Sequence, residues 1–314
     1  MKNLSTVKVF SPATVANVAC AFDVLGFALE SVGDLITAHK TKVPGVKITK
    51  IISPYGELSL DPKHNTASVA AQTLLKNLDP GLGFELEIEK QMPIGSGLGS
   101  SAASAAGAVF ALNELLNRPF TQKELITFAM EGERVAAGVA HADNVAPALL
   151  GGFTLVRQGL PLDVVKIPFP EQLVIAVVCP LIEVRTEDAR KILKKLIPFK
   201  RVVEQFGNIA GLVAGLCQKD LELIGRSLQD VIIEPERAIL IPGFKEAKQS
   251  ALDAGALGCS ISGSGPALFA FCKDLAQAQK VADALALQFK KIEIDSLVFT
   301  SAINRTGCAV VEGQ

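Results

Sequence analysis

One stretch, Met92 to Ala111, constrains this chain more than any other. Glycines occupy every second position of a short loop and two serines follow it, namely Gly95, Gly97, Gly99, Ser100 and Ser101. Alternating apolar and acidic residues at 84–89 predict a strand before the loop, and an Ala-rich segment to about Asn117 predicts a helix after it. Glycine lets a backbone approach a ligand closely, and a serine-capped helix N-terminus attracts anions. The stretch therefore predicts a phosphate-binding loop.

The residues exclude two better-known kinds of phosphate loop. A Walker A loop ends in Gly-Lys-Ser/Thr, and no lysine lies between Met92 and Asn117. The dinucleotide fingerprint requires a third glycine where this chain has Ser100. A flexible surface turn before a core helix is the alternative, but the paired serines and the small-residue helix favour a third kind of phosphate loop.

Composition narrows the class of protein. The chain has 314 residues, enough for one large or two moderate domains, and 49% of them are hydrophobic. A net charge of −1, a single tyrosine and no tryptophan argue against a nucleic-acid partner. There is no apolar run of about 18 residues and no signal-peptide pattern, so we expect no membrane span. The six scattered cysteines lack metal-ligand spacing and indicate a reducing, cytoplasmic compartment.

The string Pro93-Ile-Gly-Ser-Gly-Leu-Gly-Ser-Ser-Ala-Ala103 resembles the phosphate loop of the GHMP kinases, the galactokinase, homoserine kinase and mevalonate kinase superfamily. Residues 11–29 and 259–271 resemble its other two motifs, in the same order. The resemblance covers essentially the whole chain and implies a two-domain α+β fold. It implies an N-terminal ATP-binding domain at 1–162, a C-terminal ferredoxin-like domain at 163–314, and an active site between them.

The resemblance also assigns the ATP and metal sites. The loop residues implied to bind ATP are Pro93, Ile94, Gly95, Ser96, Gly97, Leu98, Gly99, Ser100, Ser101, Ala102 and Ala103. Asn65 is predicted to be the N-cap of the helix at 65–78. The resemblance implies that it also contacts the nucleotide. Ser101 and Glu133 are the implied Mg²⁺ ligands, since Glu133 lies eight residues before His141. Without the resemblance, Glu133 reads as a solvated helix glutamate.

Within the superfamily, residues 11–29 and 141–144 and two arginines resemble the homoserine kinase branch. The implied substrate-binding residues are Asn17, Asp23, His141, Arg190 and Arg237. Taken alone, Asn17 and Asp23 fit turn chemistry equally well, and both arginines fit surface ion pairs. The chain departs from the family pattern at Ala19-Cys20-Ala21, where Gly-Pro-Gly is usual.

The implied catalytic residues are Asn144 and Arg190. Other GHMP kinases place an aspartate base seven residues before the Gly-Gly pair, and this chain has Asn144 there. An amide cannot accept a proton at neutral pH, so Asn144 is expected to orient groups, with Asp143 as the rival base. Helix capping is the plain alternative for both residues.

The implied reaction transfers the γ-phosphoryl group of ATP, with Mg²⁺, to the hydroxyl of L-homoserine, giving O-phospho-L-homoserine in threonine biosynthesis. Another GHMP kinase acting on a sugar, mevalonate or an isoprenoid precursor is the first alternative. A non-catalytic ATP-binding regulator of the same fold is the second. The sequence leaves open a homodimer and a plastid form without its transit peptide.

Overall fold

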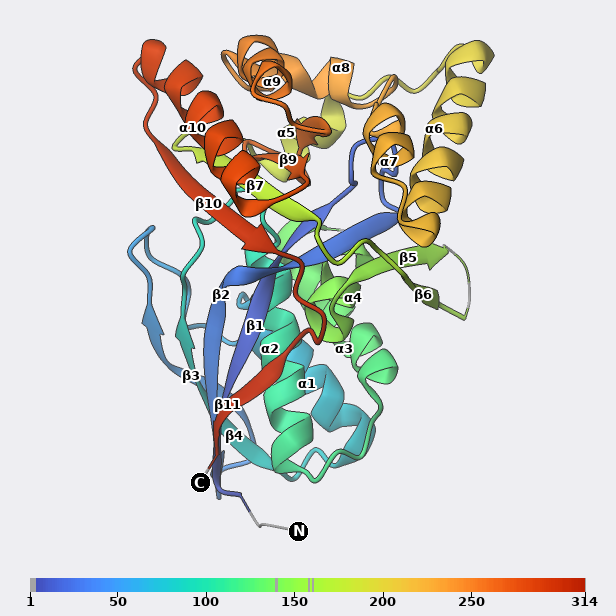
Figure 1. Cartoon of the computed structure of the whole chain (residues 1–314). Coiled ribbons are helices and arrows are strands. Elements are labelled where there is room, and N and C mark those ends of the chain that lie inside the picture. Colours follow the sequence, from blue (N-terminus) through green and yellow to red (C-terminus); the bar gives the residue numbers. More distant parts are fainter. Residues whose placement is uncertain (1–3, 139–140, 158, 160, 314) are drawn as a thin grey trace.

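The computed structural model describes residues 4–138, 141–157, 159 and 161–313 (Figure 1). The N-terminal domain contains a seven-stranded sheet, whose strands in the described chain are β1 (Thr6–Ala16), β2 (Leu25–Thr41), β3 (Gly45–Ile52), β4 (Gly83–Glu89), β5 (Phe153–Arg157), β6 (Asp163–Ile167) and β11 (Ala309–Gly313). The main path of the sheet runs β11-β1-β2-β4-β3, and β5 pairs with both β2 and β6.

Helices cover one face of this sheet (Figure 1). They are α1 (Thr66–Leu78), α2 (Ser100–Leu115), α3 (Gln122–Ala137) and α4 (Ala142–Leu150). The Ala-rich α2 is buried along most of its length, and its small side chains let α1 and α3 pack close to it. The sequence Thr121-x-x-Glu124 has the pattern of a capping box, and the structure forms that box at the start of α3.

The C-terminal domain contains a four-stranded antiparallel sheet of β7 (Val174–Pro180), β8 (Gly258–Ile261), β9 (Leu268–Cys272) and β10 (Ser296–Ala302). Its order, β10-β7-β9-β8, is the ferredoxin-like arrangement. Between β7 and β8 lie α5 (Thr186–Lys191), α6 (Phe199–Gln218), α7 (Leu221–Ser227), α8 (Glu234–Arg237), the 3₁₀ helix η1 (Ala238–Leu240) and α9 (Phe244–Asp253), and α10 (Leu275–Lys291) joins β9 to β10. The predicted two-domain α+β fold is confirmed.

The two sheets share an apolar core. Phe27 of β2 and Phe153 of β5 lie with ring centroids 4.8 Å apart, and Phe271 of β9 lies 5.6 Å from Phe27. At the edge of this core, the backbone N–H groups of Glu30 and Ser31 donate to the Ser301 hydroxyl at 2.8 and 3.0 Å. The domains are thus fixed to each other by packing as well as by the chain.

One strand boundary differs from what the sequence pattern predicts. The alternation of residues 7–11 predicts a strand there, but β1 continues to Ala16, because its second half pairs with β2 beyond a bulge near Pro12. The division predicted after residue 162 remains a prediction. If the domains are divided by sheet, the boundary falls slightly later, because β6 still belongs to the first sheet. Strand β11, at the end of the described chain, also belongs to the first sheet.

Within the part of the chain that the structure describes, no helix combines the length and apolar character needed to cross a membrane.

Candidate active site

A cavity of about 360 Å³ lies where the two domains meet. The N-terminal domain contributes the glycine loop, the start of α2 and residues of α3 and α4 to its wall. The C-terminal domain contributes Arg190, Arg237 and the Gly263–Ser264 turn. Residues far apart in sequence therefore converge on one space.

The glycine loop adopts a backbone that glycine alone tolerates well. Gly95, Gly97 and Gly99 have φ values of 68°, 82° and 64°. A Cβ atom on Gly97 would lie 2.4 Å from the carbonyl oxygen of Ser262, and one on Gly99 would lie 2.0 Å from Thr14 Oγ1. The loop backbone therefore lies in close contact with the motifs at 11–29 and 259–271.

The predicted serine cap on α2 is wrong. The N-cap residue is Gly99, in the left-handed conformation, and no side chain caps the helix. The N–H groups of the first turn are therefore free of a side-chain acceptor, at a wall of the cavity that Ser100 and Ser101 help to form. An uncapped helix N-terminus beside a cavity suits an anion.

The other two motifs hold the loop in place. Thr14 N–H donates to the Leu98 carbonyl at 3.0 Å, and Ala267 N–H donates to the Ser96 carbonyl at 3.0 Å. The Ser262 hydroxyl donates to the Gly97 carbonyl at 2.7 Å. The glycine turn near residue 263 thus closes on the loop.

A buried lysine that the sequence reasoning missed lies beneath the loop. Lys90 Nζ donates to the Ser100 carbonyl at 2.7 Å and to Ser104 Oγ at 2.9 Å, and it pairs with the buried carboxylate of Asp34. A signal was available, because Lys90 falls on the buried phase of the alternation that runs through β4. It ties the start of α2 to the sheet.

Ser101 and Glu133 lie together, as a shared ion site requires. Ser101 Oγ donates to Glu133 Oε2 at 3.1 Å, and Glu133 Oε1 is buried without a partner among the described residues. Burial raises the pKa of Glu133 to about 7, and the charge of Asp143 adds to that effect. A hydroxyl beside an unsatisfied carboxylate oxygen fits Mg²⁺, which prefers oxygen ligands. Glu131, two residues earlier, instead pairs with Arg134 at the surface.

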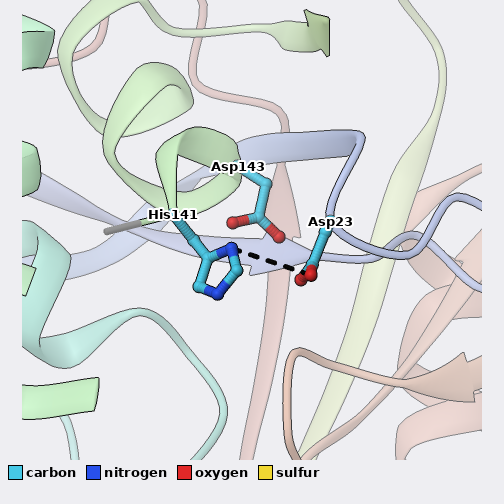
Figure 2. Close-up of side chains that lie close together, drawn as sticks. All are labelled: Asp23, His141 and Asp143. Carbon is cyan, nitrogen blue, oxygen red and sulfur yellow. Dashed lines mark ion pairs between the residues drawn. The ribbon is translucent and has the colours of Figure 1, made fainter. Parts of the chain in front are cut away.

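An acidic and basic cluster forms another part of the cavity wall. Arg190 donates to both oxygens of Asp23, at 2.9 and 3.2 Å. His141 Nδ1 lies 3.7 Å from the same carboxylate (Figure 2). Burial lowers the pKa of His141, and Arg190 lowers it further, against the pull of Asp23. The ring is therefore mostly neutral at pH 7.

Asp143 points toward this cluster from the first turn of α4 (Figure 2). Ligand-type atoms of Asp23, His141 and Asp143 lie within 4.8 Å of one another. Burial raises the pKa of Asp143 to about 7, Asp23 adds to the shift, and Arg190 opposes it. Because Arg190 already binds Asp23 through two hydrogen bonds, the cluster suits a charged organic group better than a metal ion.

Two asparagines have their oxygens occupied by protein donors. Asn144 Oδ1 accepts from the Thr14 hydroxyl at 2.7 Å, which leaves its amide nitrogen for another partner. Asn17 Oδ1 accepts from the Asp23 N–H at 3.0 Å, and its Nδ2 donates to the Gly263 carbonyl at 2.7 Å. Asn17 therefore joins the two domains at the cavity wall.

The turn around the family departure is formed without glycine. Asn17, Val18, Ala19 and Asp23 have φ values of 69°, 35°, 58° and 58°. The Ala21 N–H donates to the Asn17 carbonyl at 2.9 Å, which closes the turn. The Ala19-Cys20-Ala21 sequence is thus compatible with the position of Asp23 in the cluster.

The ring of Phe22 contacts both arginines. The Arg190 and Arg237 guanidinium carbons lie 5.4 and 4.9 Å from its ring centroid. Arg237 is buried and donates to the Ala189 and Gly263 carbonyls at 3.0 and 2.8 Å. Burial lowers its pKa to about 10, and neighbouring Arg190 contributes, so Arg237 remains charged at pH 7.

Most of the residues predicted for the site line this cavity, with four exceptions, Pro93, Leu98, Ala102 and Ala103. All four are buried, so any role in ATP binding falls to their backbone. Asn65 caps α1 by accepting from the Ala67 N–H at 3.1 Å, and it also lines the cavity. Thr186 is of a residue type that favours the N-cap position, but the N-cap of α5 is Arg185. Thr186 instead lies on the cavity wall, with its hydroxyl 3.3 Å from that of Ser264.

Comparison with known proteins identifies this arrangement. Models of the GHMP kinase N-terminal and C-terminal domains match residues 65–152 and 212–291. The homoserine kinase of Chlorobium phaeobacteroides is 47% identical, with 98% of this chain and 100% of the relative aligned. That of Chloroherpeton thalassium is 49% identical, with 96% and 98% aligned. The crystal structure of homoserine kinase from Cytophaga hutchinsonii superposes with a TM-score of 0.95 at 51% identity, over 98% of each chain.

The chain therefore belongs to the GHMP kinases and, within them, to the homoserine kinase family. Members of this family are ATP-dependent kinases that act on a hydroxyl group, so ATP is the co-substrate.

Proposed function

We propose that this protein transfers the γ-phosphoryl group of ATP to the hydroxyl of L-homoserine, a step in threonine biosynthesis. One observation carries the proposal. A single cavity has a phosphate loop on one part of its wall and the Asp23, Arg190 and Arg237 cluster on another. That combination complements a phosphate donor and a small zwitterion.

The cluster supplies charges of both signs for the amino acid. Asp23 would accept from the substrate ammonium, with neutral His141 beside it. Arg190 and Arg237 would bind the carboxylate, because a guanidinium donates in a fork that matches two oxygens. Both guanidinium groups lie over the ring of Phe22, which holds them near each other. In this proposal the ammonium and carboxylate of the substrate replace some of the hydrogen bonds between Asp23 and Arg190.

The loop and α2 hold the triphosphate. Backbone N–H groups at the start of α2 would donate to phosphate oxygens. Ser101 and Glu133 would hold Mg²⁺, which neutralises charge on the phosphate oxygens during transfer. Binding of the cation would also satisfy Glu133 Oε1, which is otherwise buried and unpaired among the described residues.

Asn144 is the proposed positioning group for transfer, together with the charge of Arg190. Its oxygen is held by Thr14, so its amide nitrogen is the atom that can donate to the substrate hydroxyl or a phosphate oxygen. Phosphoryl transfer depends mostly on alignment and charge stabilisation. Asp143 is the alternative proton acceptor, since its raised pKa lies near neutrality.

ADP release over a panel of acceptors tests the proposal. We expect Mg²⁺-dependent ADP release with L-homoserine and only background with galactose or mevalonate. ADP release with another acceptor in preference to homoserine would contradict the substrate assignment. ATP binding without turnover on any acceptor would favour a non-catalytic nucleotide-binding protein.

We also propose that the protein works in the cytoplasm without a nucleic-acid partner. The net charge of −1 supports the second statement. All six cysteines are unpaired within the described structure, which supports the first.

A further inference from the structure

Helix α6 places one polar side chain, Gln205, inside the protein, where it is only 5% exposed. The Nε2 atom of Gln205 donates to the Cys20 carbonyl at 2.8 Å and to Asp230 Oδ1 at 2.9 Å. Its Oε1 atom accepts from the Val231 N–H at 3.0 Å. Both amide protons and the oxygen are therefore used. No ionised side chain can donate twice and accept once, so the position requires an amide.

The first of these bonds holds a strained turn. The turn between β1 and β2 reaches α6 and the end of α7 in the C-terminal domain (Figure 1). Val18 and Ala19, in this turn, have φ values of 35° and 58°, which are rare for residues with a Cβ atom. Such a backbone persists only where its surroundings hold it. Here the Cys20 carbonyl accepts from Gln205, and the Cys20 thiol donates to the Ser227 carbonyl at 3.4 Å.

The same turn fixes the position of Asp23. The Ala21 N–H donates to the Asn17 carbonyl at 2.9 Å, and the Val24 N–H donates to the Ala21 carbonyl at 3.0 Å. The Asp23 N–H donates to Asn17 Oδ1 at 3.0 Å. Asp23 thus follows Cys20 by three residues within one closed turn, so a shift of the Cys20 carbonyl would also move the Asp23 carboxylate.

The other two bonds of Gln205 reach the segment that leads into α8. Val231 donates to its oxygen, and Asp230 accepts from its nitrogen. The Asp230 carboxylate also accepts from the backbone N–H groups of residues 232–234, at 2.8–2.9 Å. Asp230 therefore anchors the start of α8, and Arg237 is the last residue of that four-residue helix.

One buried amide therefore connects the turn that carries Asp23 with the helix that carries Arg237. Gln205 itself is not among the described residues that line the cavity, so its effect on a ligand is indirect. The inference rests on the proposed function, in which Asp23 binds the ammonium of the substrate and Arg237 its carboxylate. The two charges of an α-amino acid are a fixed distance apart, so their partners must be held at a matching distance. We propose that Gln205 is a positioning residue that sets the spacing of Asp23 and Arg237 and thereby the affinity for the amino-acid substrate.

Steady-state kinetics of Gln205→Met tests this role. Methionine keeps the length of the side chain and removes the amide. The Gly263 carbonyl accepts from both Asn17 and Arg237, so the two segments stay connected and the fold should survive. The KM for L-homoserine should rise about tenfold or more, while the KM for ATP should stay within about twofold of the wild type. Gln218→Met, at an exposed position of the same helix, is the matched control and should change neither value.

Rescue at the turn separates positioning from a general loss of stability. Ala19→Gly removes the Cβ atom from a left-handed position, so the turn depends less on Gln205. Added to Gln205→Met, it should lower the KM for L-homoserine by about threefold. If Gln205→Met does not fold, Gln205→Asn carries the same test, because its shorter amide cannot reach all three partners.

Three results would overturn the proposal. They are an unchanged KM for L-homoserine, a KM for ATP that rises equally, and a double variant that is no better than Gln205→Met. A wild type that phosphorylates another acceptor instead of L-homoserine would contradict the proposed function alone, and the KM for that acceptor would then measure the role of Gln205.

Discussion

The carboxyl group of Asp143 is buried and lies close to Asp23, and both features destabilise its ionised form. Its pKa is raised from 3.8 to about 7, mainly by burial. An acid with a higher pKa in the folded state binds more protons when folded. The contribution of Asp143 to the free energy of unfolding of the unliganded protein therefore falls as pH rises from about 4 to 7, and it levels off above that.

Asp143→Asn should remove this titration. Relative to the wild type, the variant should gain stability at up to about 1.4 kcal/mol per pH unit between pH 5 and 7, and no further gain above pH 7. Urea unfolding at pH 5, 6, 7 and 8 measures the difference. A difference that is constant across this range would show that Asp143 titrates normally.

Substitution of the same residue also tests which group accepts the proton of the substrate hydroxyl. If Asn144 only orients the reacting groups, kcat for Asp143→Asn keeps the wild-type pH profile, and Asn144→Asp lowers kcat by about 100-fold or more because it removes a donor and adds charge. Steady-state kinetics from pH 5.5 to 9 separates the two roles. Loss of the acidic limb in Asp143→Asn, with both substrates still bound, would identify Asp143 as the base.

Glu133→Gln tests the metal assignment, because it keeps the shape of the side chain and removes the charge. The Mg²⁺ concentration for half-maximal activity should rise about tenfold or more, since one of few protein ligands is weakened. Nucleotide affinity measured without Mg²⁺ should change much less. Identical Mg²⁺ titrations for the two proteins would mean that Glu133 only holds Ser101.

At the scale of elements, the sequence predicted best what is local. The strand, the glycine loop and α2 follow from adjacent residues, and so does the capping box of α3. The cap of α2 was mispredicted because serine is a common N-cap, whereas here Gly99 takes that position in a left-handed conformation. The N-cap preferences of residues in the loop itself cannot show that a distant turn and Thr14 lie too close to the loop for a side chain.

Contacts between distant residues were beyond the sequence pattern. Nothing in the order of residues indicates that β11 pairs with β1, or that Lys90 and Asp34 meet beneath α2. The site residues came from the family motifs rather than from residue chemistry, since Arg190 and Arg237 alone fit surface ion pairs equally well. Their convergence on one cavity depends on the packing of the two domains.

The glycine loop offers a paired test. A methyl group on Gly97 meets the Ser262 carbonyl at 2.4 Å, whereas one on Gly95 meets nothing within 4 Å. Both substitutions force an alanine into the left-handed region, at about 1–2 kcal/mol. Gly97→Ala should therefore lose more stability than Gly95→Ala, by about 1–3 kcal/mol, and should bind ATP more weakly. Urea unfolding measures the stability, and calorimetry measures the binding of ATP. Equal stability in the two variants would mean that the turn containing Ser262 can shift to accommodate the methyl group at little cost.

For the whole molecule, we expect the phenylalanine core between the sheets to make the two domains unfold as one cooperative unit. Phe271→Ala, in a fully buried site, should lower the free energy of unfolding by about 3–5 kcal/mol while leaving a single transition. Leu287→Ala, at an exposed position, should change it by no more than about 0.5 kcal/mol. Comparison of calorimetric and van't Hoff enthalpies measures cooperativity. Two resolved transitions would show that the domains unfold separately.

The pairing of β11 with β1 has a consequence for biosynthesis. Strand β1 is translated before the other strands of its sheet, and β11 follows the whole C-terminal domain. Until β11 emerges from the ribosome, one edge of β1 presents unpaired backbone groups, the kind of edge that recruits other strands. The nascent chain is thus exposed to mispairing throughout synthesis of the second domain, and a chaperone that shields this edge would raise the yield of folded protein without altering its final stability.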